Sequence, residues 1–221
     1  MRLFSGGVKR ALQDRGVTHL FHANSVETAC TFLRVGGLLS RGSVQGRGLQ
    51  QTWQPSDNLD REFGVWNDIF LDAVNIGERV HGKNNYGPVL FKINLNIFDM
   101  PGLPELWVTK SNPIHWSRDV ALNTNYFQTV HEFDETYSIG DFGSMFTLRN
   151  TNEILPFNGY LDDIFLDFPN RGNGEFENAI QALRDARREG GVIADIVTRD
   201  GGNSYANMSN NSFNRFFNPR A

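Results

Sequence analysis

The segment 88–98 constrains the fold most, because apolar side chains occupy every second position in it. The alternating apolar residues are Val89, Phe91, Ile93, Leu95 and Ile97. A period of two is typical of a strand that buries one face and exposes the other. The fold must therefore supply a core layer that covers the apolar face of this strand.

Other segments predict a mixture of helices and strands. Helical spacing indicates helices at residues 3–15, 24–35 and 175–189. Strands are expected at residues 18–22, 65–76, 106–108, 153–156, 160–168 and 192–197, the last but one following the Asn158-Gly159 turn of a hairpin. Asn24 is the expected N-cap of the second helix, with Glu27 as its capping-box partner. Since strands predominate among interspersed helices, the predicted fold class is α+β.

Two segments lack clear periodicity. Residues 40–60 are rich in Gly, Ser and Gln, and a loop of this length is usually functional or mobile, so we expect it to flank a ligand cleft. Residues 201–221 are rich in Asn, Gly and Ser and predict a flexible C-terminal tail. Residues 1–200 then form a single domain.

Composition limits the class of function. The net charge is −4, so a contact with nucleic acid needs a local patch or stacking side chains rather than a basic surface. Cys30 is the single cysteine, which excludes an intramolecular disulfide and agrees with a reducing cytoplasm. No apolar run has the length of a signal peptide or of a membrane span of ~20 residues. We expect a soluble, cytoplasmic protein without a membrane partner.

Common catalytic motifs are absent, and a few single residues remain as candidates. The sequence has no Walker loop and no G-x-G-x-x-G, and His19 and His22 lack further ligands at metal spacing, so we expect no metal. His22 ends a strand, where ligand sites collect, but it also fits a structural histidine. Glu153 begins a strand and can face a cleft, but it also fits a solvated strand end. Arg61 alone is an ordinary solvated charge.

Three blocks of the sequence, in order, resemble the DarT family of bacterial toxins. These are ADP-ribosyltransferases that use NAD to modify bases in single-stranded DNA. The blocks are Leu20-Phe21-His22-Ala23-Asn24-Ser25 with Gly37-Leu38-Leu39-Ser40, then Arg61 with Trp66-Asn67-Asp68-Ile69-Phe70-Leu71, and finally Asn152-Glu153-Ile154-Leu155-Pro156. They resemble the opening strand with its His and Gly-Leu-Leu turn, the Arg with its aromatic-rich strand, and the strand that bears the catalytic Glu.

The resemblance implies a split mixed sheet with NAD, as co-substrate, in a cleft between its halves. It implies that Glu153 and Arg61 are catalytic. It further implies an NAD site formed by His22, Ala23, Asn24, Gly37, Leu38, Arg41, Arg61, Trp66 and Phe70. Arg41 and Arg47 compete with Arg61 as the residue that binds the NAD phosphates.

The acceptor is expected to bind at residues 111–148 and nearby. Trp116 and Tyr126 could stack on unpaired bases of DNA or RNA, and Arg118 and Arg149 could contact phosphates. The same aromatic side chains fit core packing equally well. The resemblance also implies a toxin with a cognate antitoxin. Three alternatives stay open: transfer of ADP-ribose to a protein side chain, a glycosidase-like hydrolase that pairs Glu153 with Asp134 or Asp141, and a non-catalytic binding module.

Overall fold

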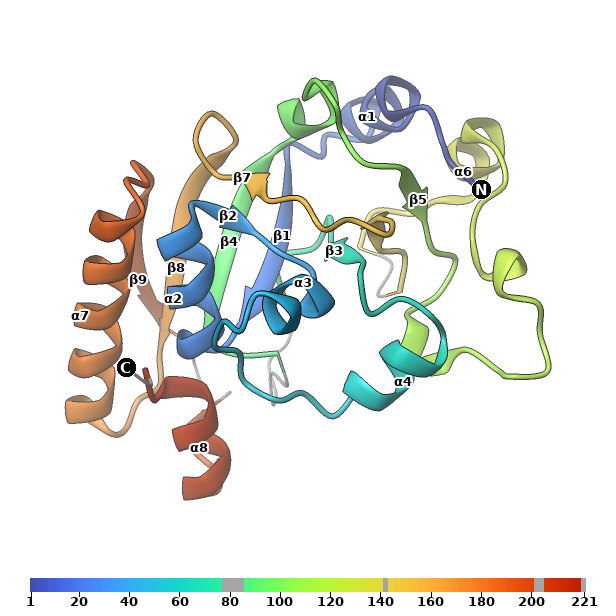
Figure 1. The fold of residues 1–221 in the computed structure, drawn as a ribbon. Helices are drawn as coiled ribbons and strands as arrows, with labels where there is room; N and C mark the ends of the chain where they lie inside the picture. The colour runs from blue at the N-terminus through green and yellow to red at the C-terminus, as the bar shows by residue number, and fades with distance from the viewer. Residues whose placement is uncertain (77–85, 141–142, 201–204, 220–221) are drawn as a thin grey trace.

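The computed structural model describes residues 1–76, 86–140, 143–200 and 205–219 (Figure 1). The predicted α+β class is confirmed, because helices surround sheets built from short strands. The largest sheet has four strands in the order β1 (His19–Asn24), β4 (Val89–Asn94), β8 (Leu161–Phe168) and β9 (Asp195–Asp200). It is mixed, since β8 and β9 run parallel and the other neighbours antiparallel.

Two smaller antiparallel sheets complete the β structure. The three-stranded sheet has the order β3 (Ile69–Leu71), β6 (Phe146–Leu148) and β5 (Leu106–Val108), and the two-stranded sheet joins β2 (Gly37–Leu38) to β7 (Leu155–Pro156). An isolated bridge between Phe21 and Asp72 connects β1 to the end of β3. The β structure is thus divided into parts that meet along β1 and β3.

The described helices lie around these sheets. They are α1 (Ser5–Asp14), α2 (Val26–Val35), α3 (Arg41–Gly46), α4 (Asp57–Glu62), α6 (Val130–Thr136), α7 (Asn173–Glu189) and α8 (Asn210–Phe217), with 3₁₀ helices η1 (Leu95–Asp99), η2 (Pro113–His115) and η3 (Leu122–Asn125). Helix α7 packs against both α2 and α8. The helices α3 and α4 both lie below β3 in the view of Figure 1.

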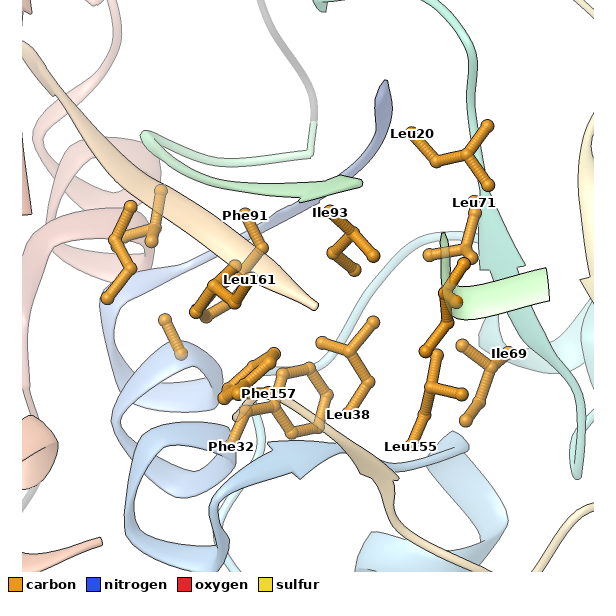
Figure 2. Packing of buried hydrophobic residues seen from close by; sticks show 14 of the residues in the cluster. Leu20, Phe32, Leu38, Ile69, Leu71, Phe91, Ile93, Leu155, Phe157 and Leu161 are labelled. Atoms are coloured by element: carbon orange, nitrogen blue, oxygen red, sulfur yellow. The ribbon is translucent and has the colours of Figure 1, made fainter. Parts of the chain in front are cut away.

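One continuous core joins the sheets. Figure 2 shows Leu38 and Leu155 of the two-stranded sheet pointing into the same cluster as Ile69 of β3 and Phe91 of β4. The ring of Phe157 stacks on that of Phe91 with their centroids 4.9 Å apart. Burial of each such side chain contributes about 1.5–3 kcal/mol relative to its exposure, so the β2–β7 pair is held in place chiefly by its apolar contacts.

The first helix–strand boundary differs from the prediction. The N-cap of α2 is Ser25, whose hydroxyl accepts the Thr28 N–H, and not Asn24. Asn24 remains in β1 because it pairs with Val89 in the ladder. The predicted strand 88–98 likewise ends at Asn94, whose side chain caps η1. The apolar residues after Asn94 are therefore buried in a 3₁₀ helix.

The predicted loop 40–60 is wrong in part, because this segment contains α3 and the start of α4. Residues 47–56 between these helices form neither helix nor strand, and the segment flanks a pocket, as expected. The Ser40 hydroxyl caps α3 by accepting the Ser43 N–H, and an ion pair between Arg41 and Asp57 ties the two helices together. These helices are too short to give a clear period in the sequence. Polar side chains hold them in place, which is why the composition looks like that of a loop.

The predicted hairpin around Asn158-Gly159 is also wrong. The strands β7 and β8 do form, but β7 pairs with β2, and β8 pairs with β4 and β9. A Cβ at Gly37 would lie 2.3 Å from the Leu155 carbonyl oxygen, so the pairing of β2 with β7 depends on the bare backbone of this glycine.

The predicted flexible tail is wrong for residues 205–217. Tyr205, Met208, Phe213, Phe216 and Phe217 are buried, and the last three lie on α8. The rings of Phe213 and Phe217 stack with their centroids 4.6 Å apart. Aromatic residues spaced along a helix bury enough surface to order a segment whose other residues are polar. Residues 201–204, 220 and 221 lie outside the described residues.

Candidate active site

A pocket of about 510 Å³ lies where β1, β3, α2 and the segment before α4 meet. Its wall also includes residues 112–115 around η2. A cavity of this size suits a small molecule or one half of a dinucleotide. Phe21, Phe32, Phe70 and Leu90 give it an apolar lining, into which polar side chains project from several elements.

His22 and Asn24 point to the same side of β1 and form a hydrogen-bonded relay in the pocket wall. His22 Nδ1 lies 2.7 Å from the Phe70 carbonyl oxygen, and His22 Nε2 lies 2.7 Å from Asn24 Nδ2. Burial lowers the pKa of His22 to about 4, so the ring is neutral near pH 7. Because a carbonyl only accepts, the single ring proton is on Nδ1, and Nε2 accepts from the Asn24 amide.

Arg41 is the arginine that lines the pocket. Its guanidinium pairs with the buried Asp57 carboxylate, at 2.6 Å between Arg41 Nε and Asp57 Oδ1. It also donates to the Thr52 carbonyl oxygen. A paired, largely buried guanidinium of this kind is fixed in orientation.

Arg61 and Arg47, the other candidate arginines, lie outside the pocket lining. The guanidinium of Arg61 stacks on the Trp66 ring, 3.6 Å from its centroid, and donates to Gln45 Oε1. Arg47 donates to the Asn152 carbonyl oxygen at 2.7 Å. Trp66 itself lines the pocket, so Arg61 contacts the outer side of a pocket residue.

Three carboxyl groups line the pocket, from Asp60, Asp68 and Asp72. Burial raises the pKa of Asp60 to about 6, although the Ser56 hydroxyl donates to it. Burial also raises the pKa of Asp68 to about 6. Perturbed carboxyl groups in a cavity are typical of functional sites, and sequence reasoning singled out none of the three. Asp68 and Asp72 flank the short apolar run 69–71, which is their only sequence signal, and Asp60 lies in a polar segment that gives none.

Asp68 connects the pocket to the segment that leads to Glu153. Its Oδ2 lies 2.8 Å from Arg149 Nε, and its Oδ1 accepts the Asn150 N–H at 2.8 Å. The Asp68 side chain is fully buried and that of Arg149 is 9% exposed. One carboxylate therefore fixes two consecutive residues that lie shortly before Glu153.

Glu153 itself is exposed and is not among the residues that line the pocket. The backbone before it is anchored on two sides. The Thr151 N–H donates to the Asn67 carbonyl oxygen at 2.9 Å, and the Ser43 hydroxyl of α3 donates to that of Asn152 at 3.2 Å. The neighbours of these anchors, Arg41 and Asp68, line the pocket. The structure thus attaches the segment before Glu153 to elements of the pocket wall, while Glu153 itself is exposed and does not line the cavity.

The remaining expected NAD residues divide into two groups. Ala23 and Phe70 line the pocket. Gly37 and Leu38 are buried in β2, pair with Pro156 and Leu155, and do not line it. They act on the site indirectly, because they attach the strand after Glu153 to the start of α3.

The expected acceptor residues are mostly in the core. Tyr126 is fully buried and Trp116 nearly so, with their rings edge-to-face at 5.3 Å. Arg149 is buried against Asp68, and Arg118 is exposed and paired with Glu62. The structure therefore shows core packing for the two aromatic residues, which leaves no stacking face on Tyr126. Exposed apolar side chains in this region are Ile114, Val120 and Ile139.

The carboxylates considered as glycosidase partners are not placed at the pocket. Asp134 pairs with Arg15 of α1 and is not a lining residue. Asp141 lies outside the described residues. Within the described ranges, no group of three or more His, Cys, Asp and Glu side chains could hold a metal ion, and no helix is long and apolar enough to cross a membrane.

No protein-family model matches this chain, and no curated protein matches it. Among solved structures, the chain is similar to Thermus sp. 2.9 DarT in complex with carba-NAD+. The alignment covers 86% of this chain and 98% of that chain, with a TM-score of 0.48 and 11% sequence identity. That solved structure carries the name of the family that the sequence blocks resemble.

Proposed function

We propose that this protein is an NAD-dependent ADP-ribosyltransferase that transfers ADP-ribose to a base in single-stranded nucleic acid. One observation carries the proposal. Segments far apart in the sequence, which resemble a NAD-binding family block by block, meet around one pocket: His22 and Asn24, Arg41, and Trp66 with Phe70. The block that contains Glu153 is attached to the same wall through Asn67 and α3.

The chemistry of the pocket fits the nicotinamide end of the dinucleotide better than its phosphates. Phe21, Phe32 and Phe70 offer an apolar surface to a flat ring. The carboxyl group of Asp60 would repel a pyrophosphate but tolerate a cationic pyridinium. We therefore place the nicotinamide riboside in the pocket and the pyrophosphate near Arg41 at its wall.

The proposed reaction breaks the bond between ribose C1′ and the nicotinamide nitrogen. The bonding electron pair goes to the nitrogen, which neutralises the ring, while positive charge develops on the ribose, as in glycoside cleavage. A nucleophilic nitrogen or oxygen of the acceptor nucleobase forms the new bond to C1′. The proton of this atom passes to a Brønsted base. In this proposal the Glu153 carboxylate stabilises the developing charge and orients or deprotonates the acceptor.

The exposed position of Glu153 suits a residue that acts on an incoming macromolecule. An acceptor base must approach the ribose from outside, so the group that deprotonates it lies at the mouth of a pocket and not at its floor. The anchored backbone at Thr151 and Asn152 limits the motion of this carboxylate. A toxin role with a cognate antitoxin belongs to the same proposal and follows from the family resemblance.

A protein acceptor is the second candidate, and two observations favour it. The net charge is −4, and the aromatic side chains of Trp116 and Tyr126 are buried instead of being available to bases. Both observations reduce the surface on which a nucleic acid could bind. The chemistry at the ribose is the same for either acceptor.

The test is to incubate the protein with NAD labelled in its adenylate part, together with single-stranded DNA, RNA and a protein extract. Label in a nucleic acid supports the proposal, and label in protein alone supports the second candidate. The Glu153→Gln variant should bind NAD but lose transfer by at least ~100-fold, the scale of a general acid–base group. Absence of both nicotinamide release and label transfer in every mixture contradicts the enzyme function.

A further inference from the structure

Asn24 carries a buried acceptor atom that its surroundings leave unsatisfied. The residue lines the pocket and is only 4% exposed. Among the residues that the structure describes, its Oδ1 has no hydrogen-bond partner, whereas its Nδ2 is engaged with His22. A buried amide oxygen without a donor is costly, so its retention at a pocket indicates a ligand that supplies the donor.

The orientation of the Asn24 amide is fixed by the residues behind it. The Phe70 carbonyl requires the proton of His22 on Nδ1, and the neutral ring then offers only a lone pair at Nε2. The amide must turn its NH₂ group toward that lone pair, at 2.7 Å. Asn24 Oδ1 is therefore held as the acceptor, and the opposite amide orientation would place two acceptors against each other.

We propose that Asn24 Oδ1 determines ligand specificity by accepting a hydrogen bond from an N–H group of the ligand. Resting on the proposed function, we assign this donor to the primary carboxamide of nicotinamide. The apolar side chains of Phe32 and Phe70 line the same pocket and would contact the ring that carries the carboxamide. His22 acts through Asn24 as a positioning residue, since it sets which atom of the amide faces the ligand.

The test compares two dinucleotides that differ in one group. NAD has a carboxamide, whereas 3-acetylpyridine adenine dinucleotide has a methyl ketone of similar size and the same charge, without an N–H. Calorimetric titration of the wild-type protein, without acceptor, should give a dissociation constant for NAD at least about tenfold lower, because the analogue leaves Asn24 Oδ1 unpaired. The Asn24→Ala variant should bind the two dinucleotides equally.

Further variants separate recognition from structural damage. Gln54→Ala removes another amide that lines the pocket but has no contact with His22, and it should keep the wild-type preference for NAD. Asn24→Asp retains an oxygen acceptor and should keep most of the preference. It should also raise the pKa of His22, which NMR titration of the imidazole measures, because the ring then faces a carboxylate.

The outcomes distinguish this inference from the proposed function. Equal affinity of the wild-type protein for both dinucleotides, or an unchanged preference in Asn24→Ala, overturns the role of Asn24 and leaves the enzyme function intact. Failure of the wild-type protein to bind either dinucleotide overturns both. Thermal unfolding of each variant shows whether it folds, and the wild-type comparison stands even if Asn24→Ala does not.

Discussion

Asp68 and Arg149 form a buried ion pair, and loss of one partner should change the stability of the protein by a different amount from loss of the other. Burial raises the pKa of Asp68 to about 6, above the ordinary 3.8, even though Arg149 Nε is only 2.8 Å away. The cost of removing the carboxylate from water therefore exceeds the attraction of the guanidinium. An asparagine at position 68 avoids this cost, but its single amide oxygen can replace only one of the two carboxylate oxygens that face the Arg149 and Asn150 N–H groups.

The magnitude follows from proton linkage. A raised pKa means that the folded state binds more protons than the unfolded state between pH 4 and 6, so the Asp68 contribution to stability falls as pH rises through this window. A difference of roughly 2 in the pKa of Asp68 between the folded and unfolded states corresponds to a loss of about 3 kcal/mol of stability above pH 6. We expect Asp68→Asn to destabilise the protein less at pH 7 than loss of the Arg149 guanidinium does, and to destabilise it more at pH 4 than at pH 7 relative to the wild-type protein.

Arg149→Met should destabilise the protein more than Asp68→Asn does at pH 7. It leaves the buried Asp68 carboxylate unpaired and should cost about 3–5 kcal/mol at pH 7. The loss should shrink toward pH 4, because Asp68 is then protonated. Arg34→Met removes an exposed pair with Glu189 and is the control, with an expected loss of about 0–1 kcal/mol.

Urea unfolding at a series of pH values between 4 and 8 measures these free energies. The reasoning is refuted if Asp68→Asn is as damaging as Arg149→Met at pH 7. That result would show that the attraction between the two side chains dominates the desolvation of the carboxylate. If the free energy of unfolding changes equally with pH in the wild-type protein and in Asp68→Asn, the raised pKa of Asp68 is also refuted.

Three further outcomes are expected. Gly37→Ala should destabilise the protein by about 1–3 kcal/mol in urea unfolding, because the new Cβ would lie 2.3 Å from a carbonyl oxygen. Gly46→Ala is the control and should change stability little, because the space around this glycine is open. Arg41→Met should weaken NAD binding in calorimetry more than Arg61→Met, since only Arg41 lines the pocket; the reverse order would place the phosphates at α4. Burial lowers the pKa of His22 from 6.5 to about 4, so the unfolded state binds more protons than the folded state between pH 4 and 6.5. The free energy of unfolding should therefore rise with pH in this window by about 3 kcal/mol. The His22→Gln variant should lack this rise.

The sequence predicted those elements whose residues share one strong period. Helix α7 and strand β4 are of this kind, because their buried faces recur at helical or alternating spacing. It did not predict α3 and α4, which are single turns or little more. The Ser40 hydroxyl caps α3, and the Arg41–Asp57 pair joins the two helices. It also could not show that β7 pairs with β2, because this partner is far away in the sequence and the choice depends on apolar packing.

The candidate site likewise contains residues that the sequence could single out and residues that it could not. His22 and Trp66 could be singled out because they stand in ordered motifs, and both line the pocket. Asp60 and Asp68 could not, because an aspartate that becomes buried looks in the sequence like one that is solvated. The sequence also could not show whether Tyr126 is buried, since an aromatic residue in a weakly periodic segment fits a core or a surface.

The charges around the pocket explain why its deep part is suited to an uncharged or cationic group. His22 is neutral, and the cation of Arg41 is balanced by Asp57. The Asp60 carboxyl has no cationic partner among the described side chains, so near neutral pH it adds negative potential inside an apolar cavity. A nicotinamide ring is cationic before its bond to ribose breaks and neutral afterwards. In the proposed reaction, the same carboxyl would therefore favour binding of the intact dinucleotide over retention of free nicotinamide, which would help product release without any movement of the wall.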